Sequence, residues 1–271
     1  MKLKAWLKDN KDLFRDNDLR FIIKNINAKE ISLSSESDAV LSKEDLLHLD
    51  KIKQMYIKGV PLSYILGKEE FFGLEFTVDS RVLIPRPDTE LIVEKALELI
   101  NKNNLYYILD LCTGSGNIAI SIKKSVDRKS LVFASDIDSG AISLAGVNRE
   151  LHKTDIKLIR SDLLDGFKPK SFDLIVSNPP YVESDNINGT LNFEPKAALD
   201  GGCDGLLFIK KILMQAHKYL KNEGYLILEI GYNYRDSSER VISQLGHYQI
   251  KEWIKDYSDS WRGVILKKAS S

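Results

Sequence analysis

Residues 106–120 read YYILDLCTGSGNIAI, and this stretch decides the fold. The apolar run 106–111 predicts a buried strand, and the glycine-containing turn that follows it opens a helix. The same alternation of strand-length and helix-length segments continues along the chain. We expect further strands at 131–136, 156–162, 172–177, 225–230, 248–254 and 261–267. Strands separated by helices predict an α/β protein with a doubly wound, largely parallel sheet.

Three regions of the chain differ in pattern. Residues 1–68 have helical periodicity and predict a small helical N-terminal domain. Residues 69–85 alternate in polarity, which predicts a short hairpin or an extended linker. The strand–helix alternation occupies residues 86–271, the expected catalytic domain, within which residues 182–204 are expected to form a long loop.

Helix boundaries are marked by capping residues. Ser42 with Asp45 forms a capping-box pattern at the start of a helix that residues 59–61, Gly-Val-Pro, should end. Asp88 or Thr89 is expected to cap a helix that runs to about residue 100.

The composition narrows the function classes. The 271 residues include 39 Lys and Arg and 39 Asp and Glu, so the formal net charge is zero. A chain without cationic excess is a poor candidate for binding DNA over a broad surface, so no direct DNA binding is expected. The sequence has no apolar run of about 18 residues and its N-terminus is charged, so we expect no membrane association.

Cysteines and histidines are few. Cys112 and Cys203 form no disulfide framework, and the four histidines lack metal-ligand spacing. We therefore expect a reducing, cytoplasmic location and no metal site.

The glycine turn predicts a nucleotide-like cofactor. Gly114, Gly116 and Ala119 fit the pattern G-x-G-x-x-A, and Asp136 follows Gly116 by 20 residues at the end of the second strand. Glycines let a ligand approach the backbone closely, and the helix N-terminus offers free N–H groups to it. A carboxylate at the end of the second strand can accept hydrogen bonds from ribose hydroxyls. NAD and S-adenosylmethionine (SAM) both satisfy this motif.

Two further carboxylates favour SAM. Asp110 precedes the turn, where an amino-acid ammonium group is expected and where a pyrophosphate would be repelled. Asp162 ends the third strand, from which it can reach an adenine amino group. Both residues also fit a purely structural role as caps of helices or turns.

The motif Asn178-Pro179-Pro180-Tyr181 follows the fourth strand, at the edge where open α/β sheets bind ligands. Such a sequence also occurs as a rigid turn. Proline fixes the backbone and holds Asn178 extended, so the Asn178 side-chain oxygen and the Pro179 carbonyl become two acceptors for one planar NH2 group. Tyr181 is expected to pack on that flat group. A glutamine amide and the exocyclic amine of adenine or cytosine both fit.

Further segments resemble the PrmC/HemK family of protein-glutamine methyltransferases, which modify peptide chain release factors. They are PLSYILG (61–67), the FFG…F segment (71–76), LIPRPDTE (83–90), LDLCTGSGNIAI (109–120), ASDID (134–138), SD (161–162), SNPPYV (177–182), FEP (193–195), ALDGGCDGL (198–206) and LEIG (228–231). The NPPY motif is shared with adenine methyltransferases, whereas PLSYILG, LIPRPDTE and ALDGGCDGL distinguish this family.

This resemblance implies a class I SAM-dependent methyltransferase, Rossmann-like with seven strands and the last antiparallel, behind an N-terminal substrate-docking domain. It implies methylation of the glutamine in the Gly-Gly-Gln motif of bacterial-type release factors, which tunes translation termination. The implied cofactor-binding residues are Asp110, Cys112, Thr113, Gly114, Ser115, Gly116, Asp136, Asp162, Leu163 and Asn178, and the implied catalytic residues are Asn178, Pro179, Pro180 and Tyr181. Cys112 stands where most members have glycine, and Leu163 where some have a larger aromatic residue.

Other readings remain at this point. A paralogous class methylates a ribosomal-protein glutamine. A DNA or RNA amino-methyltransferase would need a recognition module and a basic groove for a flipped base. An NAD-dependent dehydrogenase would need a catalytic His, Lys or Tyr near the fourth strand, where this sequence has NPPY. A non-catalytic adenosine-binding module would give the NPPY motif no role. Two roles are open for the charged residues at 86–90, which are Arg86, Asp88 and Glu90. They either approach the cofactor pocket or are only part of a helix start.

Overall fold

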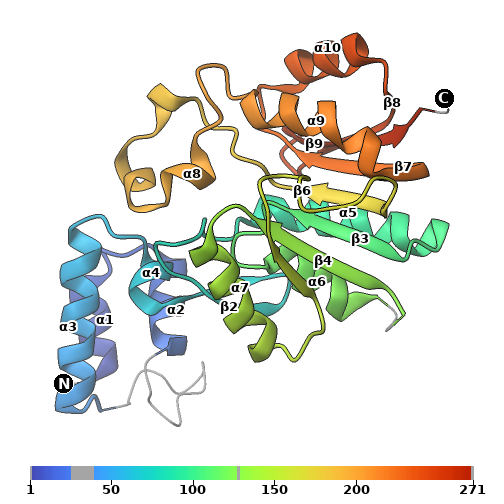
Figure 1. Cartoon of the computed structure of the whole chain (residues 1–271). Helices are drawn as coiled ribbons and strands as arrows, with labels where there is room; N and C mark the ends of the chain where they lie inside the picture. Colours follow the sequence, from blue (N-terminus) through green and yellow to red (C-terminus); the bar gives the residue numbers. More distant parts are fainter. Residues whose placement is uncertain (1, 26–39, 127–128, 270–271) are drawn as a thin grey trace. The chain divides into compact units, whose positions relative to one another are not determined.

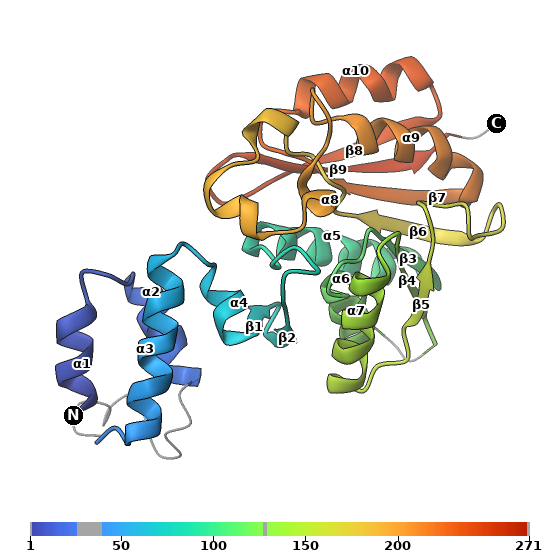
Figure 2. The same ribbon diagram turned by 60° about the vertical axis from the view of Figure 1, so that its left-hand side comes forward.

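The computed structural model describes residues 2–25, 40–126 and 129–269, which form two compact units (Figures 1 and 2). One unit ends at Gly67 and the other begins at Lys68. The hairpin that the sequence leaves as a separate linker is therefore part of the second unit.

The first unit is helical. Its helices are α1 (Leu3–Asn10), α2 (Asp16–Asn25), α3 (Lys43–Ile57) and α4 (Leu62–Leu66). They enclose an apolar cluster that includes Leu3, Ile22 and Leu49. The capping box is present as predicted, because the Asp45 N–H donates to Ser42 Oγ at 3.0 Å and the Ser42 N–H donates to Asp45 Oδ2 at 2.9 Å. The part of the helical prediction that falls on residues 26–39 lies outside the described residues.

The second unit is built on a seven-stranded sheet with the order β5-β4-β3-β6-β7-β9-β8. The strands are β3 (Tyr107–Leu111), β4 (Leu131–Asp136), β5 (Lys157–Arg160), β6 (Phe172–Ser177), β7 (Leu220–Glu229), β8 (Tyr248–Lys255) and β9 (Trp261–Lys268). Neighbours from β5 to β7 pair in parallel, whereas β9 is antiparallel to both β7 and β8. The predicted α/β class with an antiparallel last strand is confirmed.

Helices cover both faces of this sheet (Figures 1 and 2). One face carries α5 (Pro87–Asn103), α6 (Asn117–Ser125) and α7 (Ser139–Leu151), and the other carries α9 (Leu207–Tyr219) and α10 (Arg235–Leu245). Ile108 and Leu109 are adjacent in β3 and both fully buried. Burial on two faces explains why the central strands are continuous apolar runs.

A short antiparallel hairpin, β1 (Lys68–Phe71) and β2 (Leu74–Thr77), precedes α5. Phe72 and Gly73, which join the strands, both have positive φ, at 52° and 69°. A two-residue turn with this backbone matches the twist of the flanking strands.

Helix α5 begins differently from the prediction. Its N-cap is Arg86, with no side-chain cap, and Pro87 occupies the first turn, so neither Asp88 nor Thr89 is the cap. Proline is preorganised for the first helical position, where its missing N–H costs nothing. The helix continues to Asn103 and ends at Asn104, whose φ of 53° is left-handed.

Two other segments also differ. The expected loop 182–204 contains η2 (Ser184–Asn186), η3 (Gly189–Phe193) and α8 (Lys196–Leu199), which are too short to show a hydrophobic period. Strand β7 begins at Leu220 and not at the predicted residue 225. Its first residue, Leu220, pairs with Phe172, and a register shift follows before the pairing continues.

The order of the strands reverses beside β3, since the chain moves outward to β4 and β5 and then returns to β6 on the other side. Ligands bind at such a switch point, outside the carboxyl ends of the strands. The topology therefore brings the glycine turn after β3, the end of β4 and the NPPY motif after β6 to one edge of the sheet.

Candidate functional site

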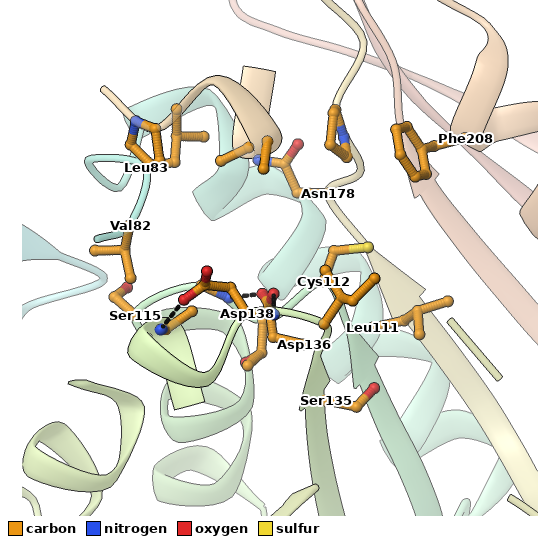
Figure 3. Close-up of a pocket in the computed structure, with 18 of the residues that line it drawn as sticks. Val82, Leu83, Leu111, Cys112, Ser115, Ser135, Asp136, Asp138, Asn178 and Phe208 are labelled. Atoms are coloured by element: carbon orange, nitrogen blue, oxygen red, sulfur yellow. Dashed lines mark hydrogen bonds between the residues drawn. The ribbon is translucent and has the colours of Figure 1, made fainter. Parts of the chain in front are cut away.

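A cavity of about 680 Å³ lies at this edge (Figure 3). Its volume is in the range of small-molecule sites. Of the residues predicted for the site, Cys112, Thr113, Gly114, Ser115, Asp136, Asp162, Leu163, Asn178 and Pro180 line it. Asp110, Gly116, Pro179 and Tyr181 do not.

The turn after β3 presents bare backbone to the cavity. Gly114 has a φ of 54°, and a Cβ added there would meet nothing within 4 Å. Gly116 has a φ of 82°, and its Cβ would lie 3.2 Å from Ala145 Cβ on α7. The first glycine thus opens the cavity surface, and the second permits close packing of the helices. Cys112 also takes a left-handed φ, 64°, a conformation that favours glycine.

The same substitution at these two glycines should differ in its balance of effects on stability and on ligand binding. Gly114→Ala should cost at most about 1–2 kcal/mol of stability, the left-handed backbone penalty, but should weaken binding of the cavity's ligand because the methyl group enters its space. Gly116→Ala meets packed side chains as well, so it should lower stability more and affect the ligand only through the turn. Urea unfolding and calorimetric ligand binding of both variants check this. Equal losses of stability would contradict the assignment.

Asp136 fixes the turn and faces the cavity. Its Oδ2 accepts from the Gly114 N–H at 2.9 Å, and its Oδ1 accepts from the Asp138 N–H at 3.0 Å. Burial raises the pKa of Asp136, and these backbone hydrogen bonds oppose the rise. Each carboxylate oxygen can accept a second hydrogen bond, so Asp136 retains acceptor capacity toward the cavity.

Asp110 lies beneath the turn. It is fully buried, and its Oδ2 accepts from the Thr113 hydroxyl at 2.5 Å and from the Ala119 N–H at 3.0 Å. Burial raises its pKa to about 7 against these hydrogen bonds. Asp110 thus supports the turn and the start of α6 with one oxygen, while its Oδ1 has no hydrogen-bond partner among the described residues, and its contact with an ammonium group stays a prediction.

Asn178 lies across the cavity from Asp136 (Figure 3). Its Nδ2 donates to Thr89 Oγ1 on α5 at 3.2 Å. Within the described ranges no hydrogen bond to Asn178 Oδ1 is seen, which leaves this oxygen as an acceptor. Pro179, the residue predicted to supply a second acceptor, is not among the lining residues.

Tyr181 is not among the residues that line the cavity, whereas the sequence predicts that its ring packs on the target group. Its hydroxyl donates to Glu229 Oε1 at 3.0 Å, at the end of β7. Burial and the neighbouring Glu229 raise the pKa of Tyr181 well above its usual value, so this hydroxyl keeps its proton.

The glycines of ALDGGCDGL make room for Tyr181. A Cβ at Gly201 would lie 2.7 Å from Tyr181 Cα, and one at Gly205 would lie 2.6 Å from the Tyr181 carbonyl oxygen. The Val182 N–H donates to the Leu199 carbonyl at 2.8 Å, and the Gly201 N–H donates to the Val182 carbonyl at 2.8 Å. This segment therefore braces the NPPY backbone.

LIPRPDTE and FEP meet in an ion pair. Glu194 is buried; Oε1 pairs with the Arg86 guanidinium, and Oε2 accepts from the Ile84 N–H at 3.1 Å. Arg86 lines the cavity, whereas Asp88 pairs with Arg262 and Glu90 accepts from the Phe72 N–H. Of the three charged residues considered at this helix start, only Arg86 approaches the cavity.

Asn148 is a supporting residue that sequence reasoning missed. It is fully buried on α7, and its Nδ2 donates to the carbonyls of Ser115 at 2.9 Å and Thr77 at 3.0 Å. Its Oδ1 accepts from the Thr77 N–H at 2.7 Å. One side chain thus joins the glycine turn to the β1–β2 hairpin.

Asn148→Ala should destabilise the protein by about 2–4 kcal/mol, because it leaves buried backbone groups without partners. We expect the ligand affinity of the cavity to fall as well, since Ser115 lines it. Chemical denaturation and ligand calorimetry provide the two readouts. A variant with unchanged unfolding midpoint would refute the bridging role.

In the parts of the chain that the structure describes, no helix is long and apolar enough to cross a membrane. Among the same residues, no cluster of three or more His, Cys, Asp or Glu side chains is placed to hold a metal ion.

The chain is similar to known proteins over most of its length. The family model "Methyltransferase small domain" matches residues 89–194. A release factor glutamine methyltransferase of Fusobacterium nucleatum is 39% identical over 255 residues, 90% of this chain and 70% of its own. One of Clostridium acetobutylicum is 36% identical over 98% of this chain and 95% of its own. A ribosomal protein uL3 glutamine methyltransferase of Francisella tularensis is 37% identical over 93% of this chain and 80% of its own.

Solved structures share the fold at lower identity. A ribosomal protein L11 methylase of Lactobacillus delbrueckii superposes with a TM-score of 0.53 at 22% identity, over 71% of this chain and 84% of its own. The T. thermophilus 16S rRNA N2 G1207 methyltransferase, in complex with AdoMet and guanosine, gives a TM-score of 0.53 at 16% identity, over 74% of this chain and 50% of its own.

Proposed function

Because this chain belongs to the family of SAM-dependent glutamine methyltransferases that includes the release factor and ribosomal protein uL3 enzymes, we propose that it methylates the glutamine of the Gly-Gly-Gln motif in bacterial-type peptide chain release factors. The chain is an enzyme, and its methyl donor is SAM. We place the reaction in the cytoplasm, where it would tune translation termination.

One observation carries the proposal for the site. Asn178 lines the same cavity as the glycine turn and Asp136; its Nδ2 is held by Thr89, and its Oδ1 has no hydrogen bond among the described residues. An acceptor fixed opposite a cofactor cradle is what orients an amide NH2 for methyl transfer. The family membership then distinguishes glutamine from a nucleobase as the acceptor.

The lining residues fit SAM. The open position at Gly114 exposes backbone where a cofactor packs, and Asp136 has acceptor capacity for ribose hydroxyls. Asp162 and Leu163 would border the adenine, and residues 112–116 would form the loop around the amino-acid part. When bound, SAM supplies an electrophilic methyl group on its sulfonium.

The protein's contribution to the chemistry is orientation. An amide nitrogen is a weak nucleophile, because its lone pair is delocalised into the carbonyl group. Asn178 Oδ1 would accept one N–H of the glutamine amide and hold the nitrogen in line with the methyl group. Positioning of this kind lowers barriers by up to about 7–11 kcal/mol. The proton on the methylated nitrogen is lost readily to water, so no side-chain base is required.

The N-terminal unit is our candidate for docking the substrate protein, over the predicted domain 1–68. Leu47 and Ile57 of α3 are 65% and 61% exposed, and apolar residues in such positions are available for a protein partner.

A second candidate substrate has a specific basis. The Francisella relative at 37% identity is named for a ribosomal protein uL3 glutamine. The same cavity would serve both substrates, so their distinction is expected to lie in docking rather than in chemistry.

A methyl-transfer assay with labelled SAM tests these alternatives. The acceptors would be a bacterial release factor, the same factor with its Gly-Gly-Gln glutamine changed to alanine, uL3 and duplex DNA. We expect label on the intact factor only. Label on uL3 alone would transfer the assignment to the paralogous class, and label on DNA would contradict glutamine methylation.

A further inference from the structure

One buried carboxylate joins two segments that border the cavity. Glu194 is buried and is not itself among the lining residues. Its Oε1 pairs with the Arg86 guanidinium, and its Oε2 accepts from the Ile84 N–H at 3.1 Å. Arg86 lines the cavity, and so does Pro195, the residue that follows Glu194. The two segments are therefore fastened to each other by a residue that does not touch the cavity's contents.

These segments form a wall that the cofactor prediction leaves unused. We call it the substrate wall, and its lining residues are Leu83, Pro85 and Arg86 from one segment and Pro195, Lys196, Ala197 and Ala198 from the other. None of them belongs to the predicted cofactor-binding set. Leu83 lies, like Asn178, across the cavity from Asp136 (Figure 3). The substrate wall is thus the surface that an acceptor brought to Asn178 would contact.

Backbone pairing does not hold the substrate wall together. Pro85 and Pro87 have no N–H, so residues 84–87 offer only two backbone donors. Within the described ranges, no backbone hydrogen bond joins residues 83–86 to residues 195–198. Helix α8 has four residues, too few to be stable by itself. The Glu194 side chain therefore supplies the link that strand pairing would supply elsewhere.

The chemistry of this link requires a carboxylate. Both partners of Glu194 are donors, one a guanidinium and the other a backbone N–H. A carboxylate accepts from both through its two oxygens. A glutamine at this position has one acceptor oxygen and would direct its NH2 group at the second donor. Glu194→Gln therefore keeps the size of the side chain and breaks one of its two links.

We propose that Glu194 is a positioning residue that fixes the substrate wall relative to Asn178 and so aligns the acceptor amide. Its effect on catalysis rests on the proposed function, whereas the fixed wall is a property of the enzyme without substrate. A misplacement of about 1 Å, even one caused far from the reacting atoms, can lower a rate by about 100-fold.

Glu194→Gln is the direct test. We expect kcat for release factor methylation to fall about 10–100-fold, while the Kd for SAM changes by less than about twofold and the calorimetric stoichiometry of SAM binding stays the same. A merely destabilised enzyme would lose kcat and SAM-binding stoichiometry together. That result, an equal loss of SAM affinity, or a wild-type kcat in Glu194→Gln would overturn the inference.

Asp173→Asn is the matched control, because Asp173 has the same kind of partners away from the cavity. It pairs with Lys221 at 2.9 Å and accepts from the Tyr107 N–H at 2.8 Å, where β3 and β6 begin. It is not a lining residue. We expect this variant to keep the wild-type kcat, and an equal fall in both variants would contradict a specific role of Glu194.

Hydrogen exchange tests the wall without any substrate. The Ala198 N–H donates to the Pro195 carbonyl at 2.9 Å, so its exchange rate reports the opening of α8. Relative to Ile227 in β7, which pairs on both sides and reports global unfolding, we expect Ala198 to exchange at least about 10-fold faster in Glu194→Gln and unchanged in Asp173→Asn. Unchanged relative exchange in Glu194→Gln refutes the inference even if the wild type methylates no release factor. Faster exchange in such an enzyme would refute only the proposed function.

Discussion

Asn178→Ala is expected to lower kcat for glutamine methylation by about 10²–10³-fold, the effect of removing one preorganised hydrogen-bond partner from an active site. The substitution removes the acceptor that fixes the substrate nitrogen, and it leaves the glycine turn and Asp136 in place. The Kd for SAM should therefore stay within about twofold of the wild type. Single-turnover transfer and calorimetric SAM binding measure the two quantities independently.

Asn101→Ala is a suitable control for Asn178→Ala, because Asn101 is exposed on α5 and outside the cavity lining. It should transfer methyl groups at the wild-type rate. A parallel loss of SAM binding and transfer in Asn178→Ala would instead place Asn178 in the cofactor site. Undiminished transfer would remove its role altogether.

Asp136→Ala is expected to weaken SAM binding by at least about 100-fold. Two hydrogen bonds to a charged acceptor contribute about 1.5–3 kcal/mol each, and a tenfold change corresponds to about 1.4 kcal/mol. The same carboxylate holds the Gly114 N–H, so part of the loss will arise from the loosened turn. Asp136→Asn keeps one acceptor and should give an intermediate affinity.

Asp165→Ala serves as the acidic control, since Asp165 is exposed and does not line the cavity. Calorimetry should give it the wild-type Kd. If Asp136→Ala also retained the wild-type Kd, the ribose assignment would be wrong.

The sequence predicted the framework of the second unit well. Strands 131–136 and 172–177 have their predicted bounds, because each is a short, largely apolar segment whose middle residues are mostly buried in the sheet. The predicted start of α5 lies two to three residues too late, because proline at the first turn, and not a side-chain cap, marks where this helix begins.

The site was predicted less completely than the fold. Position in the chain indicated that Asp110 and Tyr181 lie near the cofactor, but it did not indicate on which side of the turn or strand end each side chain lies. Asn148 and Thr89 could not be found from local patterns, because their partners Thr77 and Asn178 are 71 and 89 residues away in the chain. Contacts of that separation depend on the packing of helices against the sheet.

The position of β9 has a consequence for biosynthesis. This strand lies between β7 and β8, although β8 precedes it in the chain. While residues 261–268 are still in the ribosomal exit tunnel, β8 has no partner and the outer edge of β7 is unpaired. Unpaired edges of this kind are prone to aggregation, and partly synthesised domains expose them. The nascent chain therefore completes its sheet only after residues 261–268 have emerged, and until then β7 and β8 each present an unpaired edge.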